Sequence, residues 1–224
     1  MRINKYIALA TGLSRRAADA AIAQGSVTVN GMVAGMGQDV TDKDQVTLNS
    51  KPVQPPAHTA TIILHKPTGY VVSRLGQGSK TIYELLPPEF HTLKPVGRLD
   101  KDSSGLLLMT NNGALANQLT HPRYAKTKIY DVMLNKPLAP LHKQMIIDYG
   151  VQLEDGLSSF QLTKRSDDRQ WRVTMQEGRN RQIRRTFAAL GYTVIKLHRT
   201  RFGNYQLNDI KSGSWQKVTE NEIL

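Results

Sequence analysis

A proline-rich segment near residue 55 divides this chain into two parts that we expect to fold separately. Three of the five residues from 52 to 56 are proline. Proline cannot donate a backbone hydrogen bond within a helix or a central strand, so residues 51–58 favour an extended spacer. We therefore predict a small domain over residues 1–58, spacer included, and a larger domain over residues 59–224.

The first fifty residues predict two short helices and a small β element. Apolar residues recur at helical spacing up to Gly12, a typical helix stop, and Ser14 is a typical N-cap for a second helix that ends at Gly25. Asn30-Gly31 is a strong signal for a hairpin turn after an alternating strand. The small domain is therefore expected to be a compact α-plus-hairpin unit.

Beyond the spacer, apolar runs and alternating patterns predict a domain dominated by β-sheet. The expected strands cover residues 61–65, 70–73, 106–110, 128–134, 160–163, 171–175 and 193–197. A helix is expected from about Gln182 to Leu190, with Gly191 as its stop. The chain as a whole is therefore assigned to the α+β class.

The charge balance points to a polyanionic partner. Thirty Lys and Arg side chains against eighteen Asp and Glu give a net charge of +12 and a pI near 10.0. Within residues 164–201 eleven basic side chains accompany three acidic ones. Such a concentration is typical of nucleic-acid-binding proteins, although a charge run alone is more often a solvated face.

Other classes of protein are disfavoured by what the sequence lacks. With no cysteine, disulfides, thiolate catalysis and cysteine-ligated zinc are excluded, and the six histidines show no paired metal-ligand spacing. We therefore expect no metal site. No run of about 18 apolar residues predicts a membrane span, and the first residues lack the apolar stretch of a signal peptide, so we expect a cytoplasmic protein.

The densest chemical signal is the charged segment at residues 97–105, whose sequence is GRLDKDSSG and which runs directly into the predicted strand 106–110. A polar loop that enters a core strand holds its side chains at a fixed place on a rigid scaffold, where catalytic groups are usually found. The simplest alternative is a polar turn. Asp100 is the residue on which we centre the functional interpretation.

Two other chemistries would use the aspartates of this segment. Asp100, Asp102, Ser104 and Gly105 imitate the first half of a calcium loop, but the twelfth position is Asn111 rather than Glu. The two aspartates would also suit a glycosidase, yet both would have to act on one substrate from one short loop. Both interpretations are disfavoured.

A second charged segment, EGRNRQIRR at residues 177–185, places four arginines around the start of the predicted helix. Guanidinium groups and free backbone N–H groups at a helix N-terminus are suited to phosphate. Since Ile183 and Phe187 would face the core, Arg184 lies at the margin of the buried stripe, and we expect it to pair with Asp100. An exposed amphipathic helix is the alternative.

These segments together resemble one enzyme family. Residues 97–107 resemble the defining motif of the RsuA/RluB/RluE/RluF family of pseudouridine synthases, which act on ribosomal RNA. HKPTG at 65–69, KIY at 128–130 and the arginine segment are similar to the family's other motifs, in the family's order. Residues 1–50 resemble the ribosomal protein S-four type of RNA-binding domain. The resemblance implies a mainly antiparallel catalytic sheet and no cofactor, since the isomerisation of uridine is redox-neutral.

The resemblance also implies roles for residues. Asp100 becomes the essential carboxylate, as nucleophile at C1′ or as a base that starts elimination, and the sequence leaves both open. Arg184 favours its ionised form. Tyr130 stacks on the uracil, with a core aromatic as the alternative, and Leu197 lines the uracil pocket. Arg98 holds a flanking phosphate or fills the space left by a flipped base.

The remaining predicted RNA contacts are basic. They come from the arginine segment and from the small domain, and comprise Arg179, Arg181, Arg185, Lys5, Arg15 and Arg16. The expected partner is ribosomal RNA, with large-subunit RNA preferred, and the expected state is a monomer without membrane association. The competing functions are a non-catalytic ribosome-associated RNA-binding protein and an RNA nuclease, which would need a histidine pair or metal carboxylates.

Overall fold

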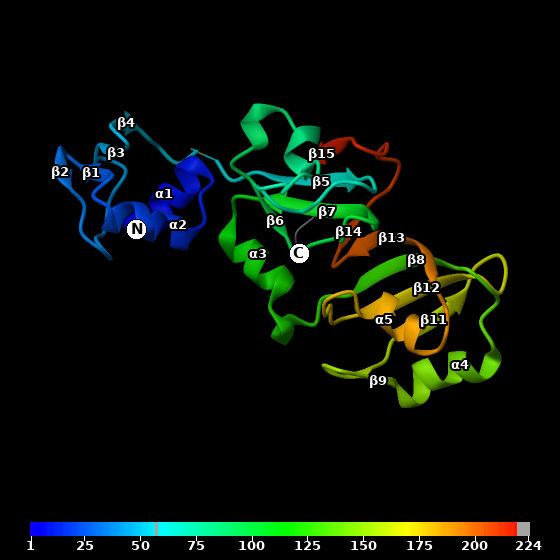
Figure 1. Cartoon of the computed structure of the whole chain (residues 1–224). Helices are drawn as coiled ribbons and strands as arrows, with labels where there is room; N and C mark the ends of the chain where they lie inside the picture. The colour runs from blue at the N-terminus through cyan, green and yellow to red at the C-terminus, as the bar shows by residue number, and fades with distance from the viewer. Residues whose placement is uncertain (57, 219–224) are drawn as a thin grey trace. The chain divides into compact units, whose positions relative to one another are not determined.

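The computed structural model describes residues 1–56 and 58–218. Ala57 of the predicted spacer and residues 219–224 of the predicted larger domain therefore lie outside the described residues. Contacts between Cα atoms divide the chain into two compact units (Figure 1). The first comprises Met1–Ala60, Pro87–Lys94 and Thr110–Asn112, and the second comprises Thr61–Leu86, Pro95–Met109 and the described residues from Gly113 onward.

The N-terminal sixty residues form two helices and a small antiparallel sheet. The elements are α1 (Ile3–Thr11), α2 (Arg15–Ala23), β1 (Val27–Val29), β2 (Met32–Val33), β3 (Val46–Leu48) and β4 (Lys51–Pro52), with sheet order β2-β1-β3-β4. Gly12 ends α1 at a φ of 76°, and the Ser14 hydroxyl accepts a hydrogen bond from the N–H of Ala17. Asn30 and Gly31, at φ of 51° and 84°, form the predicted hairpin turn.

The predicted spacer begins later than expected. Lys51 and Pro52 form β4, in which Lys51 pairs with Leu48 and Pro52 with Thr47. The assignment of these two residues to an extended spacer was therefore wrong. The physical reason is that β4 lies at the edge of the sheet, where the missing N–H of a proline leaves no ladder bond unmade.

The second unit is built on a sheet that has nine strands among the described residues. Its order is β11-β12-β8-β13-β7-β5-β15, while β14 pairs with β13 and β6 with β7. The strands are β5 (Thr61–Lys66), β6 (Lys94–Val96), β7 (Ser104–Thr110), β8 (Lys128–Leu134), β11 (Gln161–Lys164), β12 (Gln170–Met175), β13 (Val194–Phe202), β14 (Tyr205–Gln206) and β15 (Trp215–Lys217). A separate hairpin is formed by β9 (Val151–Leu153) and β10 (Gly156–Ser158).

Short helices connect these strands. They are α3 (Gly113–Thr120), α4 (Pro140–Gln144), α5 (Gln182–Ala189), the 3₁₀ turns η1 (Ile82–Leu85), η2 (Pro88–Phe90) and η3 (Pro122–Tyr124), and the π-helical turn η4 (Met145–Tyr149). In the described residues no helix is long and apolar enough to cross a membrane. The α+β class and the mainly antiparallel sheet are confirmed.

One predicted strand is absent. In place of a strand at 70–73, only Val71 is paired, through an isolated bridge to Thr81. This bridge is parallel, so the short segment between the two residues must return to its starting direction. It does so through a tight turn, in which a Cβ at Gly76 would lie 1.9 Å from the Ser79 carbonyl oxygen. Little length is left for a ladder.

The parallel pairing of β7 with β13 is the feature of the sheet that positions the charged loop before β7. Gly105 is the register partner of Arg199, and the pairing brings the two backbones unusually close. A Cβ at Gly105, whose φ is 110°, would lie 2.2 Å from the carbonyl oxygen of Arg199. Only glycine fits this approach without displacing a strand.

Candidate active site

A cavity of about 890 Å³ lies in the second unit and brings most of the predicted site residues together. Its lining includes Asp100, Tyr130, Leu197, Arg98, Arg179 and Arg181. Arg184 and Arg185 are not among the lining residues, although both lie on α5. Lys5, Arg15 and Arg16 belong to the first unit and are exposed there.

A buried lysine holds the loop that carries Asp100 through hydrogen bonds to its backbone. Lys66, at the end of β5, is fully buried, and its ammonium donates hydrogen bonds to the carbonyl oxygens of Pro67 (3.0 Å), Asp100 (3.0 Å) and Ser103 (2.7 Å). Burial lowers the pKa of Lys66 to about 8, against the opposing effect of Asp100 and Asp102. Lys66 therefore fixes the backbone on which the Asp100 carboxylate stands.

The role of Lys66 is not predicted from the sequence. The signal available was a lysine at the end of an otherwise apolar buried strand, where a cation must find hydrogen-bond acceptors. Which acceptors it finds depends on a loop more than thirty residues away along the chain, as the separations of its bonds to Asp100 and Ser103 show.

Among the described residues, the basic side chain that forms an ion pair with the Asp100 carboxylate is Arg181. Its Nη1 lies 3.4 Å from Asp100 Oδ2, and its two terminal nitrogens donate to both oxygens of Asp102 at 3.1 and 3.0 Å. Hydrogen bonds from Arg181 lower the pKa of Asp102, and the charge of Arg184 adds to that effect. The Asp102 carboxylate is thus held ionised and orients the guanidinium beside Asp100.

Arg184 has a different partner from the one predicted. Its Nε lies 3.3 Å from Asp102 Oδ2, and Nη2 donates to the Asp102 carbonyl (2.9 Å) and to the hydroxyl of Ser103 (3.3 Å). Nη1 donates to the carbonyl of Val194 at 2.7 Å. The predicted direct pairing with Asp100 was therefore wrong, because the side chain of Arg181, the residue just before α5, takes that position. Arg184, whose side chain is only 11% exposed, ties the loop to β13 instead.

The floor of the cavity is one face of the central sheet. Tyr130 on β8 is the register partner of Arg199 on β13, and Leu197 is the partner of Val132. Tyr130 and Leu197 are both buried and both line the cavity. Tyr130 is therefore both a buried aromatic residue of the sheet and part of the cavity floor, so the two interpretations are compatible.

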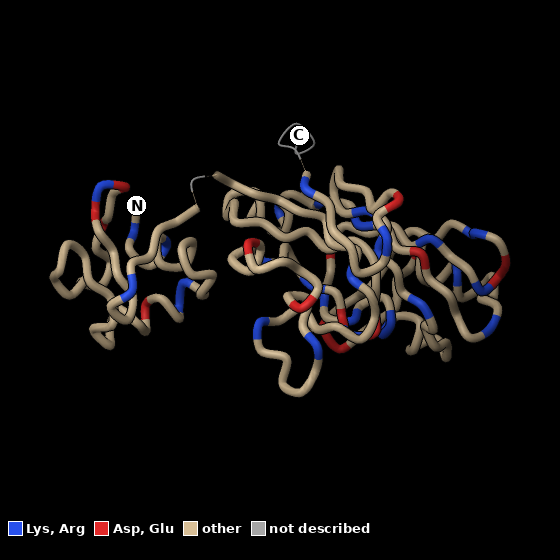
Figure 2. Tube along the Cα trace, turned by 90° about the horizontal axis from the view of Figure 1, so that it is seen from above, with Lys and Arg blue, Asp and Glu red and all other residues tan. Residues whose placement is uncertain are grey.

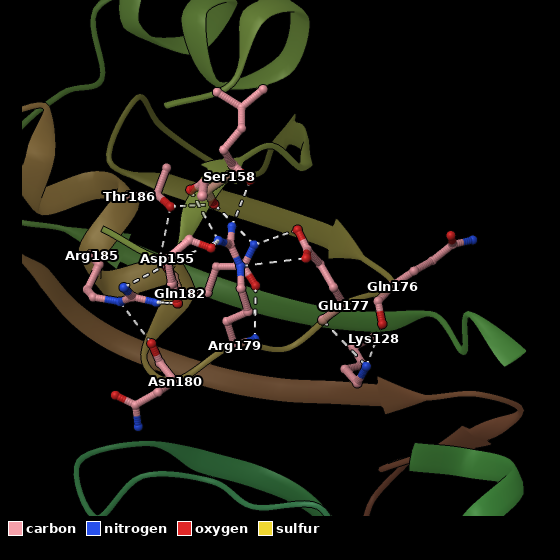
Figure 3. A network of polar contacts seen from close by, with 12 residues as sticks. Lys128, Asp155, Ser158, Gln176, Glu177, Arg179, Asn180, Gln182, Arg185 and Thr186 are labelled. Carbon is pink, nitrogen blue, oxygen red and sulfur yellow. Dashed lines mark hydrogen bonds and ion pairs between the residues drawn. The ribbon is translucent and has the colours of Figure 1, made fainter. Parts of the chain in front are cut away.

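Arg179 and Arg185 are engaged within the protein (Figure 3). Arg185 donates to both oxygens of Asp155 at 3.0 and 2.6 Å, and Arg179 donates to an oxygen of Asp155 at 3.0 Å and to the carbonyl of Leu157 at 2.8 Å. Asp155 lies in the turn between β9 and β10, so these arginines fasten that hairpin to the start of α5. Their predicted contacts with RNA remain a prediction.

A buried glutamine supports the same segment. Gln182, 3% exposed, donates to Glu177 Oε1 (2.8 Å) and Ser158 Oγ (3.1 Å) and accepts from the N–H of Arg179 (3.1 Å) (Figure 3). Arg181, the residue before Gln182, has a left-handed backbone with a φ of 45°. Such a conformation is unfavourable for a residue other than glycine and is found where surrounding contacts impose it.

The cavity walls are strongly basic. The charged lining residues are Arg98, Lys126, Lys128, Arg179, Arg181 and Arg199 on the positive side, with Asp100 and Glu177 on the negative side. Lys and Arg also outnumber Asp and Glu along the second unit (Figure 2). No group of three or more His, Asp or Glu side chains in the described residues is placed to hold a metal ion. The site therefore places the Asp100 carboxylate in a cavity where basic residues outnumber acidic ones, which suits a polyanion.

Comparison with known proteins identifies the class. The family model described as RNA pseudouridylate synthase matches residues 60–189, more than half of the chain. This chain belongs to the RNA pseudouridylate synthase family, and the expectation of an enzyme from this family of isomerases is confirmed.

Individual relatives extend the similarity over the whole chain. The ribosomal large subunit pseudouridine synthase B of Bacillus subtilis is 35% identical over 230 residues, which covers 99% of this chain and 93% of the relative. The ribosomal small subunit pseudouridine synthase A of Pasteurella multocida is 34% identical and is matched over 98% of its length. A crystal structure of a pseudouridylate synthase superposes with a TM-score of 0.71 at 29% identity, over 100% of this chain and 98% of that one.

Proposed function

We propose that this protein isomerises specific uridines of ribosomal RNA to pseudouridine, with Asp100 as the essential carboxylate. The observation that carries the proposal is the Asp100 carboxylate on the lining of a basic cavity, beside the Arg181 guanidinium and with Tyr130 and Leu197 on the same lining. The full-length similarity to enzymes named for ribosomal subunits supports the substrate class.

The reaction rearranges one nucleotide without any co-reactant. The N1–C1′ bond breaks, the uracil turns within the cavity, a C5–C1′ bond forms, and the proton on C5 is lost while N1 gains one. Asp100 acts at the sugar, either by adding to C1′ or by removing a proton to start elimination. Both routes need an ionised carboxylate, and Arg181 supplies positive charge 3.4 Å from it.

Tyr130 is the proposed partner of the uracil ring. Its side chain is buried and lines the cavity, so its ring offers a fixed stacking surface. Its hydroxyl is proposed to assist removal of the C5 proton. Leu197 completes an apolar surface for the base. Arg184 is proposed to act through the loop that carries Asp100, since its guanidinium binds the backbone and side chain of that loop.

A uridine inside folded RNA must leave its stack to reach this cavity. Extrusion costs about a few kcal/mol of stacking energy, which contacts with the vacated RNA must offset. Arg98 lines the cavity two residues before Asp100 and is exposed, so it is placed to contact a flanking phosphate or to fill the vacated space. Arg179 and Arg181 stay proposed contacts of the RNA backbone, whereas Arg185 is proposed to stabilise the fold, because its guanidinium donates to both oxygens of Asp155.

The N-terminal sixty residues are proposed to act as an S-four-type RNA-binding domain. Lys5, Arg15 and Arg16 are exposed there, the last two in the first turn of α2. Structured RNA is recognised largely through its shape and backbone, for which exposed basic side chains are suited.

Mapping of pseudouridines in ribosomal RNA tests the function. RNA from cells that lack the protein should miss one or a few pseudouridines, and the purified protein should restore them on an unmodified transcript. Relatives are named for either subunit. We expect the site in large-subunit RNA. An unchanged map together with tight ribosomal RNA binding would favour the non-catalytic RNA-binding protein, and strand cleavage on a denaturing gel would favour a nuclease.

A further inference from the structure

The floor of the cavity has two chemically different halves along β8 and β13. Tyr130 and Leu197 form one half. Lys128 lies two residues before Tyr130 on β8 and pairs with Phe202 of β13. Arg199 of β13 is the register partner of Tyr130. All five side chains line the cavity. Two residues of a strand span about 6.6 Å. The apolar half thus continues directly into a cationic half.

Two cations converge on one aromatic ring in the cationic half. Lys128 Nζ lies 5.4 Å and Arg199 Cζ 4.9 Å from the centroid of Phe202. Burial lowers the pKa of Lys128, and the charge of Arg199 lowers it further, while Glu177 opposes the shift. Two like charges that oppose each other in this way are stabilised when an anion joins them.

Arg199 has donor capacity that the protein does not use. The residue is only 2% exposed, and its Nε donates to the carbonyl of Leu106 at 2.8 Å. Its Nη2 has no hydrogen-bond partner within residues 1–56 and 58–218. A buried donor without an acceptor is costly, so each one calls for an explanation, and a ligand that supplies the acceptor is a direct one.

Lys128 is already held in place for a further contact. Its ammonium donates to the carbonyl oxygens of Gln176 (2.6 Å) and Glu177 (3.4 Å), as Figure 3 shows. An ammonium has three donors, so one remains after these two bonds. Lys128 therefore combines a fixed position with a donor for a ligand oxygen.

We propose that Lys128 and Arg199 form a subsite for an RNA backbone phosphate next to the target uridine. The proposal rests on the proposed function, because it takes the apolar half of the floor as the uracil site. In a nucleotide the ribose separates the base from the phosphate. The two-residue spacing between the apolar and the cationic halves of the floor leaves room for such a ribose between a bound base and its phosphate. A phosphate would neutralise the positive charges of Lys128 and Arg199. Its oxygens would accept hydrogen bonds from Arg199 Nη2 and Lys128 Nζ.

The first test measures the salt dependence of binding to transcribed ribosomal RNA by the full-length protein. Lys128→Met should weaken binding about 10-fold and reduce the slope of log K against log salt by about one, as loss of one phosphate contact predicts. Lys128→Arg should restore both values. Lys196→Met is the matched control, since Lys196 is an exposed lysine on β13 outside the cavity and should keep the original slope.

The second test leaves the protein unchanged and alters the RNA. Fragments around a mapped target uridine carry a neutral methylphosphonate in place of one flanking phosphate at a time. One substitution should weaken binding by the native protein about 10-fold and should have no further effect on Lys128→Met. If Lys128→Met does not fold, the comparison of native protein on charged and neutral RNA decides alone.

Two results would overturn the phosphate subsite. One is a folded Lys128→Met variant with the native salt slope, and the other is native binding that is insensitive to a neutral linkage on either side of the uridine. Failure of the proposed function can be distinguished from failure of the phosphate subsite. If the proposed function is wrong, no pseudouridine forms, but the difference in salt slope between Lys128→Met and Lys196→Met still tests the subsite.

Discussion

Arg181 joins the two aspartates of the GRLDKDSSG loop: its guanidinium lies 3.4 Å from Asp100 and forms a bidentate pair with Asp102. Because the fork of the guanidinium is occupied by Asp102, the orientation of Arg181 is fixed independently of Asp100. A positive charge therefore stays beside the proposed catalytic carboxylate even while that carboxylate reacts.

Asp102→Asn tests this arrangement. The change removes the charge that orients Arg181 and Arg184, so kcat for pseudouridine formation should fall about 10-fold, while Kd for RNA should stay within about 2-fold. Steady-state kinetics and a binding titration measure the two quantities. Asp148→Asn, at an exposed position outside the cavity, is the matched control. Native kcat in Asp102→Asn would show that Arg181 needs no such support.

Arg185→Met separates a structural arginine from an RNA contact. Because Arg185 pairs with both oxygens of Asp155, its loss should lower the melting temperature but leave the salt slope of RNA binding unchanged. Arg98→Met, which removes an exposed arginine of the cavity, should reduce that slope by about one. A reduced slope in Arg185→Met would restore the direct RNA role predicted from the sequence.

Lys66 should give the stability curve a distinctive pH dependence. Its pKa is about 8 in the folded protein and 10.5 for an ordinary lysine, so between these values the unfolded chain binds more protons than the folded one. The free energy of unfolding should therefore rise with pH across that window, relative to Lys66→Met. Urea titrations of both proteins at several pH values measure the difference. Parallel curves would mean that Lys66 is not buried as an ammonium.

Gly105→Ala tests the close approach of β7 and β13. The added Cβ would meet the Arg199 carbonyl at 2.2 Å and the backbone φ is 110°, so we expect a loss of about 2–4 kcal/mol in the free energy of unfolding. Gly113→Ala is the control, because nothing lies within 4 Å of its Cβ position and alanine favours the helix that begins there. Equal stability of the two variants would contradict the strand register.

Features decided by neighbours in sequence were predictable. Gly12 and Ser14 mark helix ends through their own backbone and side-chain preferences, and both act as predicted. The alternation at residues 128–134 gave a strand with the predicted bounds because its two faces have different environments. The order of the family motifs along the chain indicated the family itself.

Features decided by distant neighbours were not predictable. Lys66 meets the carbonyls of Asp100 and Ser103 only because β5 and the loop before β7 end at the same place. Arg181, and not the predicted Arg184, lies beside Asp100. This placement depends on the left-handed backbone of Arg181 just before α5, which helix periodicity cannot predict. Two- and three-residue strands such as β14 and β15 carry too short a pattern to detect.

The catalytic role of Asp100 is tested by measuring pseudouridine formation by Asp100→Asn on transcribed ribosomal RNA, at single-nucleotide resolution and beside an RNA-binding titration. Asparagine keeps the shape of the side chain and removes its charge, so we predict no detectable pseudouridine at the native sites and RNA affinity within about 3-fold of native. Turnover by Asp100→Asn at the native rate would show that the Asp100 carboxylate is not essential for pseudouridine formation.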